Sequence, residues 1–484
     1  MELNEERSYT TLEEVTKLLL AARGKTFREL DETGRGDSAG NKGSLGNIIE
    51  ESVLHYPVNS DREADILVGD KRYELKVTPL IHRGKTGKKI SAKERLVIDI
   101  INYLKLPAED FDGSTFWEKA RRMIVVYYYD DRTDRKHQSR LDCKVLGAFS
   151  FEYEENDLAT IREDWQFIHD KVTNGYANLL SESDTSYLAA CTKGQNAAKS
   201  LRPSPAPAGS LESTVPAKQR AFSYKQSYMT RVANRILGRD KGVSRLSMAA
   251  NQSLNEYIQE KTGKYIGKTV GEITQMLGLP DTTAKNANSI LALRMLGTSE
   301  KSIRHVDQLA AANVSQLKTV VLYKNQMPQE SMSFKALTEG QWKELGDSSV
   351  TWHDSFIYQF FETNKFLMMV FEASGNSRKD SGRLTDVFKE CVLWNMPEKD
   401  IEKYVYPVWR EVHNLLLAGA SVCYDKKDEK NKLPGQNFNK VFHFRPHGRN
   451  AADTVQLPNR EIIPKQSFWL DRRYIGKIFA GTVA

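Results

Sequence analysis

Cysteine is scarce in this sequence. The 484 residues contain four cysteines, and they lie far apart with no Cys-x-x-Cys spacing. This spacing excludes a zinc ribbon, and the low count is typical of proteins in a reducing compartment. We therefore expect a cytoplasmic protein.

Long apolar runs are also missing. No stretch approaches the roughly 20 apolar residues that a membrane-spanning helix needs, and the first ten residues, MELNEERSYT, are too polar and acidic for a signal peptide. Neither sign of charge dominates strongly, since the formal net charge is +7. This mild basicity permits a polyanionic partner without requiring one.

The segment Asp65–Lys76, DILVGDKRYELK, predicts a β-hairpin around the turn dipeptide Gly69-Asp70. This turn places Asp65 opposite Glu74, and the alternation of side chains along a strand puts Glu74 and Lys76 on one face. Two carboxylates so close together repel each other unless a cation lies between them. The hairpin therefore favours a metal-dependent phosphodiesterase site. The alternative is a solvated Glu–Lys ion pair on an exposed strand.

The residues around the hairpin predict helices and a basic loop. Apolar periodicity indicates helices at Thr10–Ala22, Thr26–Leu30 and Gly43–His55, and Glu50 lies beside the apolar face of the last one. Residues 81–95 contain six basic residues and one acid, so this loop either grips a phosphate backbone or is simply solvated.

The middle of the chain alternates expected strands, a helix and a loop. Arg122–Tyr129 and Leu146–Tyr153 are expected to be strands, and Asp157–Asn174 a helix. The Pro- and Ser-rich segment Leu201–Pro216 is expected to be a loop of low structure content within a domain. Ala217–Met229 is expected to be another strand.

The chain repeats one pattern. Gly24-Lys25-Thr26 recurs 243 residues later as Gly267-Lys268-Thr269, and the apolar strand at Arg122 recurs at Lys365 with the same displacement. The repeat continues with Lys42 and Lys285, with Trp165, His169 and Gly175 against Trp409, His413 and Gly419, and with Lys218-Gln219 against Lys465-Gln466. A near-constant displacement in one order indicates two copies of one fold. We predict an α/β protein with domains 1–232 and 233–484, each a central mixed sheet flanked by helices.

The repeat also predicts that the two copies differ at the candidate site. Asp65, Glu74 and Lys76 correspond to Asp307, Gln316 and Lys318, and Glu50 corresponds to Leu293. The second copy lacks two of the three carboxylates, so we expect it to be catalytically inactive while still binding DNA. Trp165 and His169 are retained where the carboxylates are not, which indicates core packing for this pair.

Several blocks of sequence resemble a known family. Lys42–Glu50 (KGSLGNIIE), the D-x8-ELK pattern of Asp65–Lys76 and Lys93–Tyr103 (KERLVIDIINY) resemble the MutH nuclease fold of the PD-(D/E)xK class. Further blocks are similar to the Sau-three-A-I-type subfamily of type II restriction endonucleases, namely Ser186–Ala197, Ala217–Met229, Gln329–Phe334, His443–His447 and Lys465–Ile475. The Asp-to-Glu interval is longer than in the mismatch-repair enzyme, and a longer turn absorbs the difference.

The resemblance implies a fold, an activity and a set of site residues. It implies two tandem MutH-like domains that make Mg²⁺-dependent double-strand cuts in DNA at 5′-GATC, with the second domain binding another site as an effector. The implied metal carboxylates are Glu50, Asp65 and Glu74, and the catalytic lysine is Lys76. The expected DNA-binding residues are Lys42, Lys93, Arg95, Lys193, Arg445 and His447. The last two lie in the family's arginine-proline loop, where the first copy has only Thr192-Lys193-Gly194.

The implied partners are double-stranded DNA and a cognate DNA methyltransferase that protects the host. The protein is expected to be a monomer in solution, and its state on DNA stays open. Two alternatives remain: a mismatch-repair-type nicking endonuclease at GATC, and a DNA-binding regulator in which neither copy cuts. A structural protein with solvated surface charges would leave the repeat unexplained.

Overall fold

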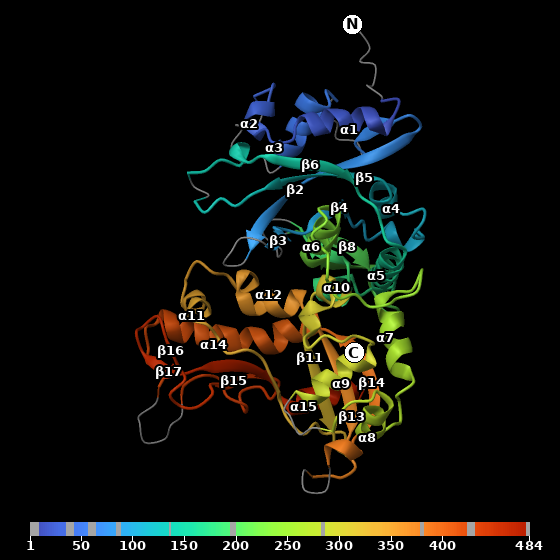
Figure 1. The fold of residues 1–484 in the computed structure, drawn as a ribbon. Coiled ribbons are helices and arrows are strands. Elements are labelled where there is room, and N and C mark those ends of the chain that lie inside the picture. The colour runs from blue at the N-terminus through green and yellow to red at the C-terminus, as the bar shows by residue number, and fades with distance from the viewer. Residues whose placement is uncertain are drawn as a thin grey trace.

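The computed structural model describes residues 9–34, 43–56, 64–83, 89–134, 137–193, 200–281, 286–377, 382–423 and 431–480. The molecule is elongated, with the N-terminal half (blue to green) above the C-terminal half (yellow to red) in Figure 1. No helix of the described ranges is long and apolar enough to cross a membrane.

The main sheet of the first half is mixed. Its strands are β1 (Ile66–Val68), β2 (Lys71–Arg83), β5 (Met123–Tyr129) and β6 (Val145–Ser150), in that order, with β3 (Lys89–Ala92) also paired to β2. β2 and β5 run parallel, and the other pairs are antiparallel. The order and mixed directions agree with the α/β architecture expected from the sequence.

Helices cover both faces of this sheet because β5 is apolar at every position. Ile124, Val126 and Tyr128 pack with residues of α1 (Leu12–Ala21), α2 (Phe27–Leu30) and α3 (Ser44–Asn47). The alternate residues Met123, Val125 and Tyr127 belong to the core that contains α4 (Thr115–Ala120) and α5 (Glu155–Thr173). The central strand is therefore buried from both sides, as strands of parallel pairs usually are.

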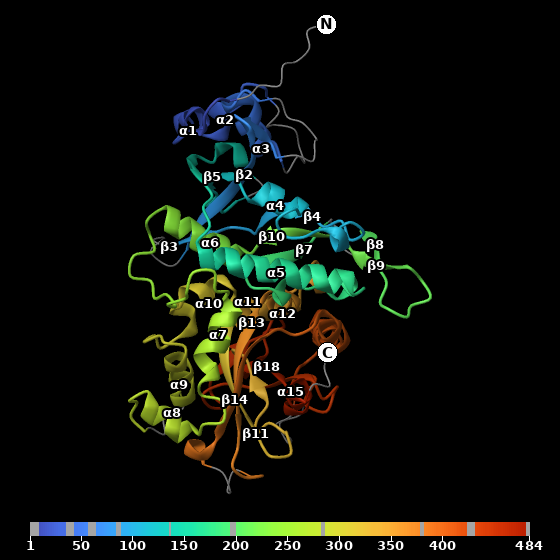
Figure 2. The same cartoon turned by 90° about the vertical axis from the view of Figure 1, so that its right-hand side faces the viewer.

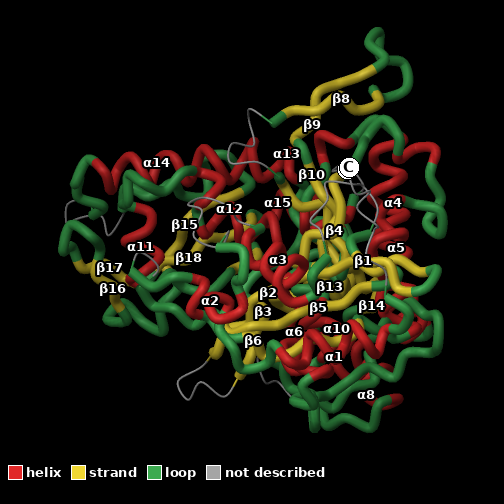
Figure 3. The backbone as a smooth tube through the Cα atoms, turned by 90° about the horizontal axis from the view of Figure 1, so that it is seen from above, coloured by secondary structure: helices red, strands yellow, loops and turns green. Residues whose placement is uncertain are grey.

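A smaller antiparallel sheet completes the first half. Its order is β4 (Leu96–Ile100), β10 (Arg220–Tyr224) and β7 (Leu188–Thr192), and α6 (Gln226–Ile236) follows β10. The hairpin of β8 (Leu201–Pro205) and β9 (Thr214–Lys218) projects from the body of the molecule (Figure 3).

The second half repeats the central part of this strand arrangement, without counterparts of β1 and β3 among its described residues. β11 (Val314–Leu322) lies parallel to β13 (Lys365–Glu372), and β13 is antiparallel to β14 (Val387–Trp394). A second sheet has the order β12 (Met332–Ser333), β18 (Gln466–Leu470) and β15 (Phe442–Pro446), and β16 (Thr454–Gln456) and β17 (Ile462–Pro464) form a hairpin. The helices are α7 (Leu254–Gly263), α8 (Val270–Met276), α9 (Ala287–Met295), α10 (Asp307–Ala311), α11 (Glu339–Leu345), α12 (Phe356–Thr363), α13 (Glu398–Asp400), α14 (Tyr406–Leu417) and α15 (Arg472–Phe479).

The repeated residues have equivalent local structures. Gly24 and Gly267 both adopt a positive φ, +82° and +80°, and each is followed by a threonine that caps a helix through a reciprocal capping box with a glutamate. Such a backbone conformation favours glycine. The aromatic pairs repeat too: Trp165 stacks on His169 with ring centroids 5.1 Å apart, and Trp409 stacks on His413 at 4.5 Å.

A continuous core and a cluster of ion pairs join the two halves. One apolar cluster includes Tyr228 and Val232 of α6 together with Leu291 of α9 and Val314 of β11. Figure 2 shows α5 and α6 directly above α7 and α10. Beside this core, the buried Arg231 guanidinium forms ion pairs with Glu154, Asp157 and Asp307.

Several local predictions were wrong. Leu201–Pro216 contains strand β8 and most of strand β9, which pair with each other, rather than a loop of low structure content. Residues 81–83 and 89–92 of the basic segment are strands, because β2 runs to Arg83 and pairs with β3. Gln226–Met229, expected as strand, begins α6. The helix expected at Gly43–His55 is α-helical only over Ser44–Asn47 and continues as a π-helix at Ile48–Val53.

Candidate active site

The β1–β2 hairpin has the predicted register. Ile66 faces Tyr73, Leu67 faces Arg72, and Gly69 in the turn has φ +60°. Asp65 lies just before β1 and reaches across the hairpin, where its Oδ2 accepts a hydrogen bond of 2.8 Å from the Leu75 amide. The turn therefore brings Asp65 next to the strand that contains Glu74.

Glu74 and Lys76 contact each other, as the alternation of strand side chains predicts. The Lys76 ammonium donates to Glu74 Oε1 at 2.5 Å, and Glu74 is only 4% exposed. The other carboxylate oxygen, Oε2, is buried and has no hydrogen-bond partner among the residues that the structure describes. An unsatisfied buried carboxylate oxygen is costly, so this atom is poised to accept a cation or a donor from a ligand.

Glu50 approaches the same place from the π-helical turn Ile48–Val53. Burial, followed by the charges of Asp65 and Glu74, raises the pKa of Glu50 to about 7. The pKa of Glu74 is also raised by burial and by Asp65, against the opposing effect of Lys76. π-Helical turns often occur at functional sites. The mutual influence of these carboxylates shows that the structure brings Glu50, Asp65, Glu74 and Lys76 together.

Sequence reasoning missed Lys119, a further cation near this group. Lys119 lies on α4 and forms an ion pair of 3.1 Å with Asp99. Burial lowers its pKa, but Asp99, Glu74 and Asp65 together outweigh burial and raise it. No local motif marks this lysine, because it is close to the hairpin only through the packing of α4 beside β2.

The carboxylates do not already form a closed metal site. Within the described ranges, no three His, Cys, Asp or Glu side chains are gathered closely enough to hold a metal ion by themselves. Mg²⁺ usually keeps several waters and is bound through one or two carboxylates together with substrate phosphate oxygens. Asp65 and the unpartnered Oε2 of Glu74 are of the right chemical type for such an open site.

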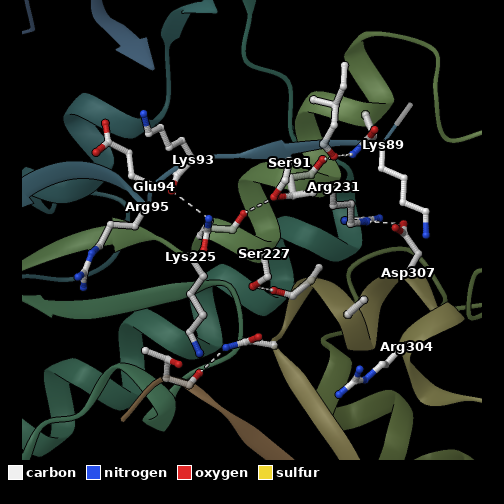
Figure 4. A pocket seen from close by; sticks show the side chains of 18 of the residues that line it. Lys89, Ser91, Lys93, Glu94, Arg95, Lys225, Ser227, Arg231, Arg304 and Asp307 are labelled. Carbon is white, nitrogen blue, oxygen red and sulfur yellow. Dashed lines mark hydrogen bonds and ion pairs between the residues drawn. The ribbon is translucent and has the colours of Figure 1, made fainter. Parts of the chain in front are cut away.

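The predicted DNA-binding residues of the first half differ in their surroundings. Lys93 forms an ion pair with Asp130, and Arg95 forms one with Glu182. Both line a cavity of about 930 Å³ between the two halves, into which Lys225 and Arg231 also project (Figure 4). Lys193 is half-buried at the end of β7, and Lys42 lies outside the described residues.

Arg445 and His447 lie together at an exposed edge of the second half. The Arg445 guanidinium stands 4.9 Å above the Trp469 ring, and the His447 ring meets the same indole edge-on at 5.4 Å. β18 pairs Ser467 with Arg445, and β10 pairs Arg220 with Thr192. The register thus places Arg445 at the position that Thr192 occupies in the first half.

The strand registers also show what the second half has in place of the carboxylates. Glu74 and Lys76 pair with Met123 and Val125, while Gln316 and Lys318 pair with Phe366 and Met368. The displacement is 242 residues on the first strand of each pair and 243 on the second. Gln316 and Lys318 are therefore equivalent to Glu74 and Lys76, as the repeat predicted.

The predicted partner of Asp65 was wrong. Val68 forms a parallel bridge with Tyr9, and Val306 forms a parallel bridge with Ser244, so the displacement is 238 residues from Val68 to Val306 and 235 from Tyr9 to Ser244. Asp65 then corresponds to Ile303, while Asp307 begins α10 and binds Arg231. The second half has no turn equivalent to that of the β1–β2 hairpin among its described residues. The number of residues that separates corresponding positions of the two copies therefore changes at this point. The second half therefore keeps only the lysine.

The carboxylate–lysine group lies within and beside a segment that is similar to a known nuclease family. Residues 54–164 match the family model described as DNA mismatch repair enzyme MutH. This segment contains Asp65, Glu74 and Lys76 but starts after Glu50, so the position of Glu50 rests on the geometry alone.

The whole chain is similar to one particular enzyme. The type II restriction enzyme Sau3AI of Staphylococcus aureus is 29% identical over 507 residues, which cover 97% of this chain and 98% of that enzyme. The resemblance drawn from the sequence motifs is thus confirmed along both halves. Together the two matches support the predicted class of site-specific deoxyribonuclease.

Proposed function

We propose that this protein is a type II restriction endonuclease that makes Mg²⁺-dependent double-strand cuts in DNA at 5′-GATC. The observation that carries the proposal is the group formed by Glu50, Asp65, Glu74 and Lys76 in a MutH-type domain. The full-length similarity to a type II restriction enzyme supports double-strand cleavage.

Asp65 and Glu74 would hold the ion, and Glu50 would support it or orient a water. A bound Mg²⁺ would lower the pKa of the attacking water and stabilise charge on the phosphate. Lys76 lies beside Glu74, where its ammonium can position the attacking water by hydrogen bonding; to help deprotonate that water, the side chain would first have to lose a proton to solvent and then accept one as the neutral amine. Burial of Glu74 excludes competing water from the carboxylate and strengthens these electrostatic contacts.

We propose further that residues 1–232 and 233–484 are tandem MutH-like copies and that the second copy binds another DNA site as an effector. The shared strand connections, the repeated capping boxes and the equivalent registers support this organisation. Lys42, Lys93, Arg95, Lys193, Arg445 and His447 are the proposed DNA contacts. Lys93 and Arg95 would have to exchange Asp130 and Glu182 for phosphates.

The decisive experiment is a digest of unmethylated plasmid by the purified protein, with and without Mg²⁺, followed by sequencing of the ends. Double-strand ends at GATC that require the ion would establish reaction, site and cofactor together. Nicks in one strand of hemimethylated GATC would instead favour a mismatch-repair-type enzyme. Salt-sensitive binding without any cleavage would point to a regulator. A restriction activity also implies a cognate methyltransferase, and we propose a monomer in solution.

A further inference from the structure

A second cavity lies at the place in the C-terminal half that corresponds to the active site. Its volume is about 500 Å³. It is lined by Leu293, Ile303, Gln316 and Lys318, the residues that stand where the first half has Glu50, Asp65, Glu74 and Lys76. No residue that lines this cavity is a carboxylate, although the corresponding positions of the first half include Glu50 and Glu74.

The lining of this cavity is basic. Its charged or titratable side chains are Lys301, Arg304, Lys318, Lys335 and His447, and no Asp or Glu lines it. None of these five side chains forms an ion pair with a carboxylate of the described residues. Three unneutralised lysines and an arginine around one hollow repel each other, and a bound anion would relieve this repulsion.

Lys318 is the innermost of these cations. Its ammonium donates to the Ser333 carbonyl and lies 4.9 Å above the Phe334 ring. Burial lowers the pKa of Lys318 to about 8, and no neighbouring carboxylate opposes that effect. In the first half the equivalent lysine, Lys76, forms an ion pair with Glu74. In the second half Gln316 replaces Glu74, so the Lys318 ammonium lacks this counter-ion.

We propose that this cavity binds a backbone phosphate of duplex DNA directly, without a divalent ion. The inference rests on the proposed role of the second copy in DNA binding, and it identifies where the backbone is held. Arg304 also lines the large cavity between the halves, while His447 continues into the exposed segment that contains Arg445. The cations therefore form part of an extended surface, which suits a polymer better than a single small anion.

The test uses the full chain with Lys301→Ala and Lys335→Ala combined, because both lysines are exposed and their removal should leave folding intact. Binding of a GATC duplex is measured by fluorescence anisotropy in EDTA at several salt concentrations. We expect the affinity to fall by about tenfold or more and the slope of log K against log salt to decrease by about two. The matched control is Lys324→Ala with Lys343→Ala, two exposed lysines of the same half outside this cavity.

Two results would overturn the proposal. One is wild-type affinity and salt slope in the double variant. The other is thermal stabilisation of the wild type by inorganic phosphate that the double variant loses, with DNA binding unchanged, since this outcome would make the cavity a site for a small anion. Binding in EDTA needs no cleavage, so failure of the proposed nuclease activity would be visible separately, in the plasmid digest.

Discussion

Glu50 should make the metal-free protein less stable as the pH rises. Its pKa in the folded protein is about 7 and its ordinary value is 4.5, so the folded state binds more protons than the unfolded chain between these values. Stability is therefore highest below the lower value and is lost as the pH passes through the higher one. The difference corresponds to roughly 3 kcal/mol, because each tenfold change in proton affinity is worth about 1.4 kcal/mol.

Glu50→Gln removes this penalty and should stabilise the protein in EDTA at about pH 8 by roughly 2–3 kcal/mol, with little effect at about pH 4.5. The same substitution should weaken cleavage in Mg²⁺, because the site loses a carboxylate. The measurement is urea unfolding followed by tryptophan fluorescence at both pH values. Glu94→Gln is the matched control, since Glu94 is exposed in the turn after β3.

Addition of Ca²⁺ provides an independent check. A bound divalent ion should favour the charged form of Glu50, so Ca²⁺ should stabilise the wild type more at about pH 8 than at about pH 5. Equal stability of the wild type and Glu50→Gln at about pH 8 in EDTA would refute this reasoning. It would mean that other groups of the protein already offset the cost of burying the ionised Glu50 carboxylate.

Three further substitutions test other parts of the molecule. Asp65→Ala should lower the cleavage rate by more than roughly 100-fold while leaving duplex binding in EDTA within a few fold, and cleavage at a normal rate would contradict its role as a ligand. Arg231→Ala should lower the free energy of unfolding by about 3 kcal/mol, because it removes the nearest cation from the buried Asp157 and leaves only Arg235, at 3.6 Å, to pair with it; urea unfolding measures this, and a loss below about 1 kcal/mol would count against the cluster as a joint between the halves. Arg445→Ala should reduce discrimination between GATC and a one-base variant by about 1–3 kcal/mol in competition binding, whereas an equal loss on both duplexes would indicate a phosphate contact.

Local rules predicted the elements that depend on local chemistry. The Gly69-Asp70 turn fixed the register of the β1–β2 hairpin, and that register brought Asp65 beside Glu74. The paired positive-φ glycines and capping boxes made the repeat detectable. These predictions were correct because the hydrogen bonds of a turn or a helix cap form between residues within a few positions of each other.

The features that sequence reasoning missed depend on distant contacts. The β8–β9 hairpin carries Pro and Ser in place of an alternating apolar pattern, and its strands pair with each other and with no other strand of the described residues. Lys119 reaches the site through the packing of α4, and the equivalence of Asp65 with Ile303 appears only in the bridge between Ser244 and Val306. When one fixed offset is used to match residues of the two copies, any residue beyond a change in turn length is matched to the wrong position.

The difference between the two halves at the candidate site and its counterpart follows from the cost of burying carboxylates. In the first half, Glu50 and Glu74 are kept in a place that raises the pKa of both, so the folded protein bears them at a cost in stability. On the proposed function, this cost is offset by the metal ion that cleavage requires. If the second copy holds DNA without cutting it, as proposed, the uncharged residues Leu293, Ile303 and Gln316 spare it that cost. On the proposed phosphate site, the loss of the carboxylates leaves Lys318 without a counter-ion, so the position that would bind a cation in the first half would bind an anion in the second.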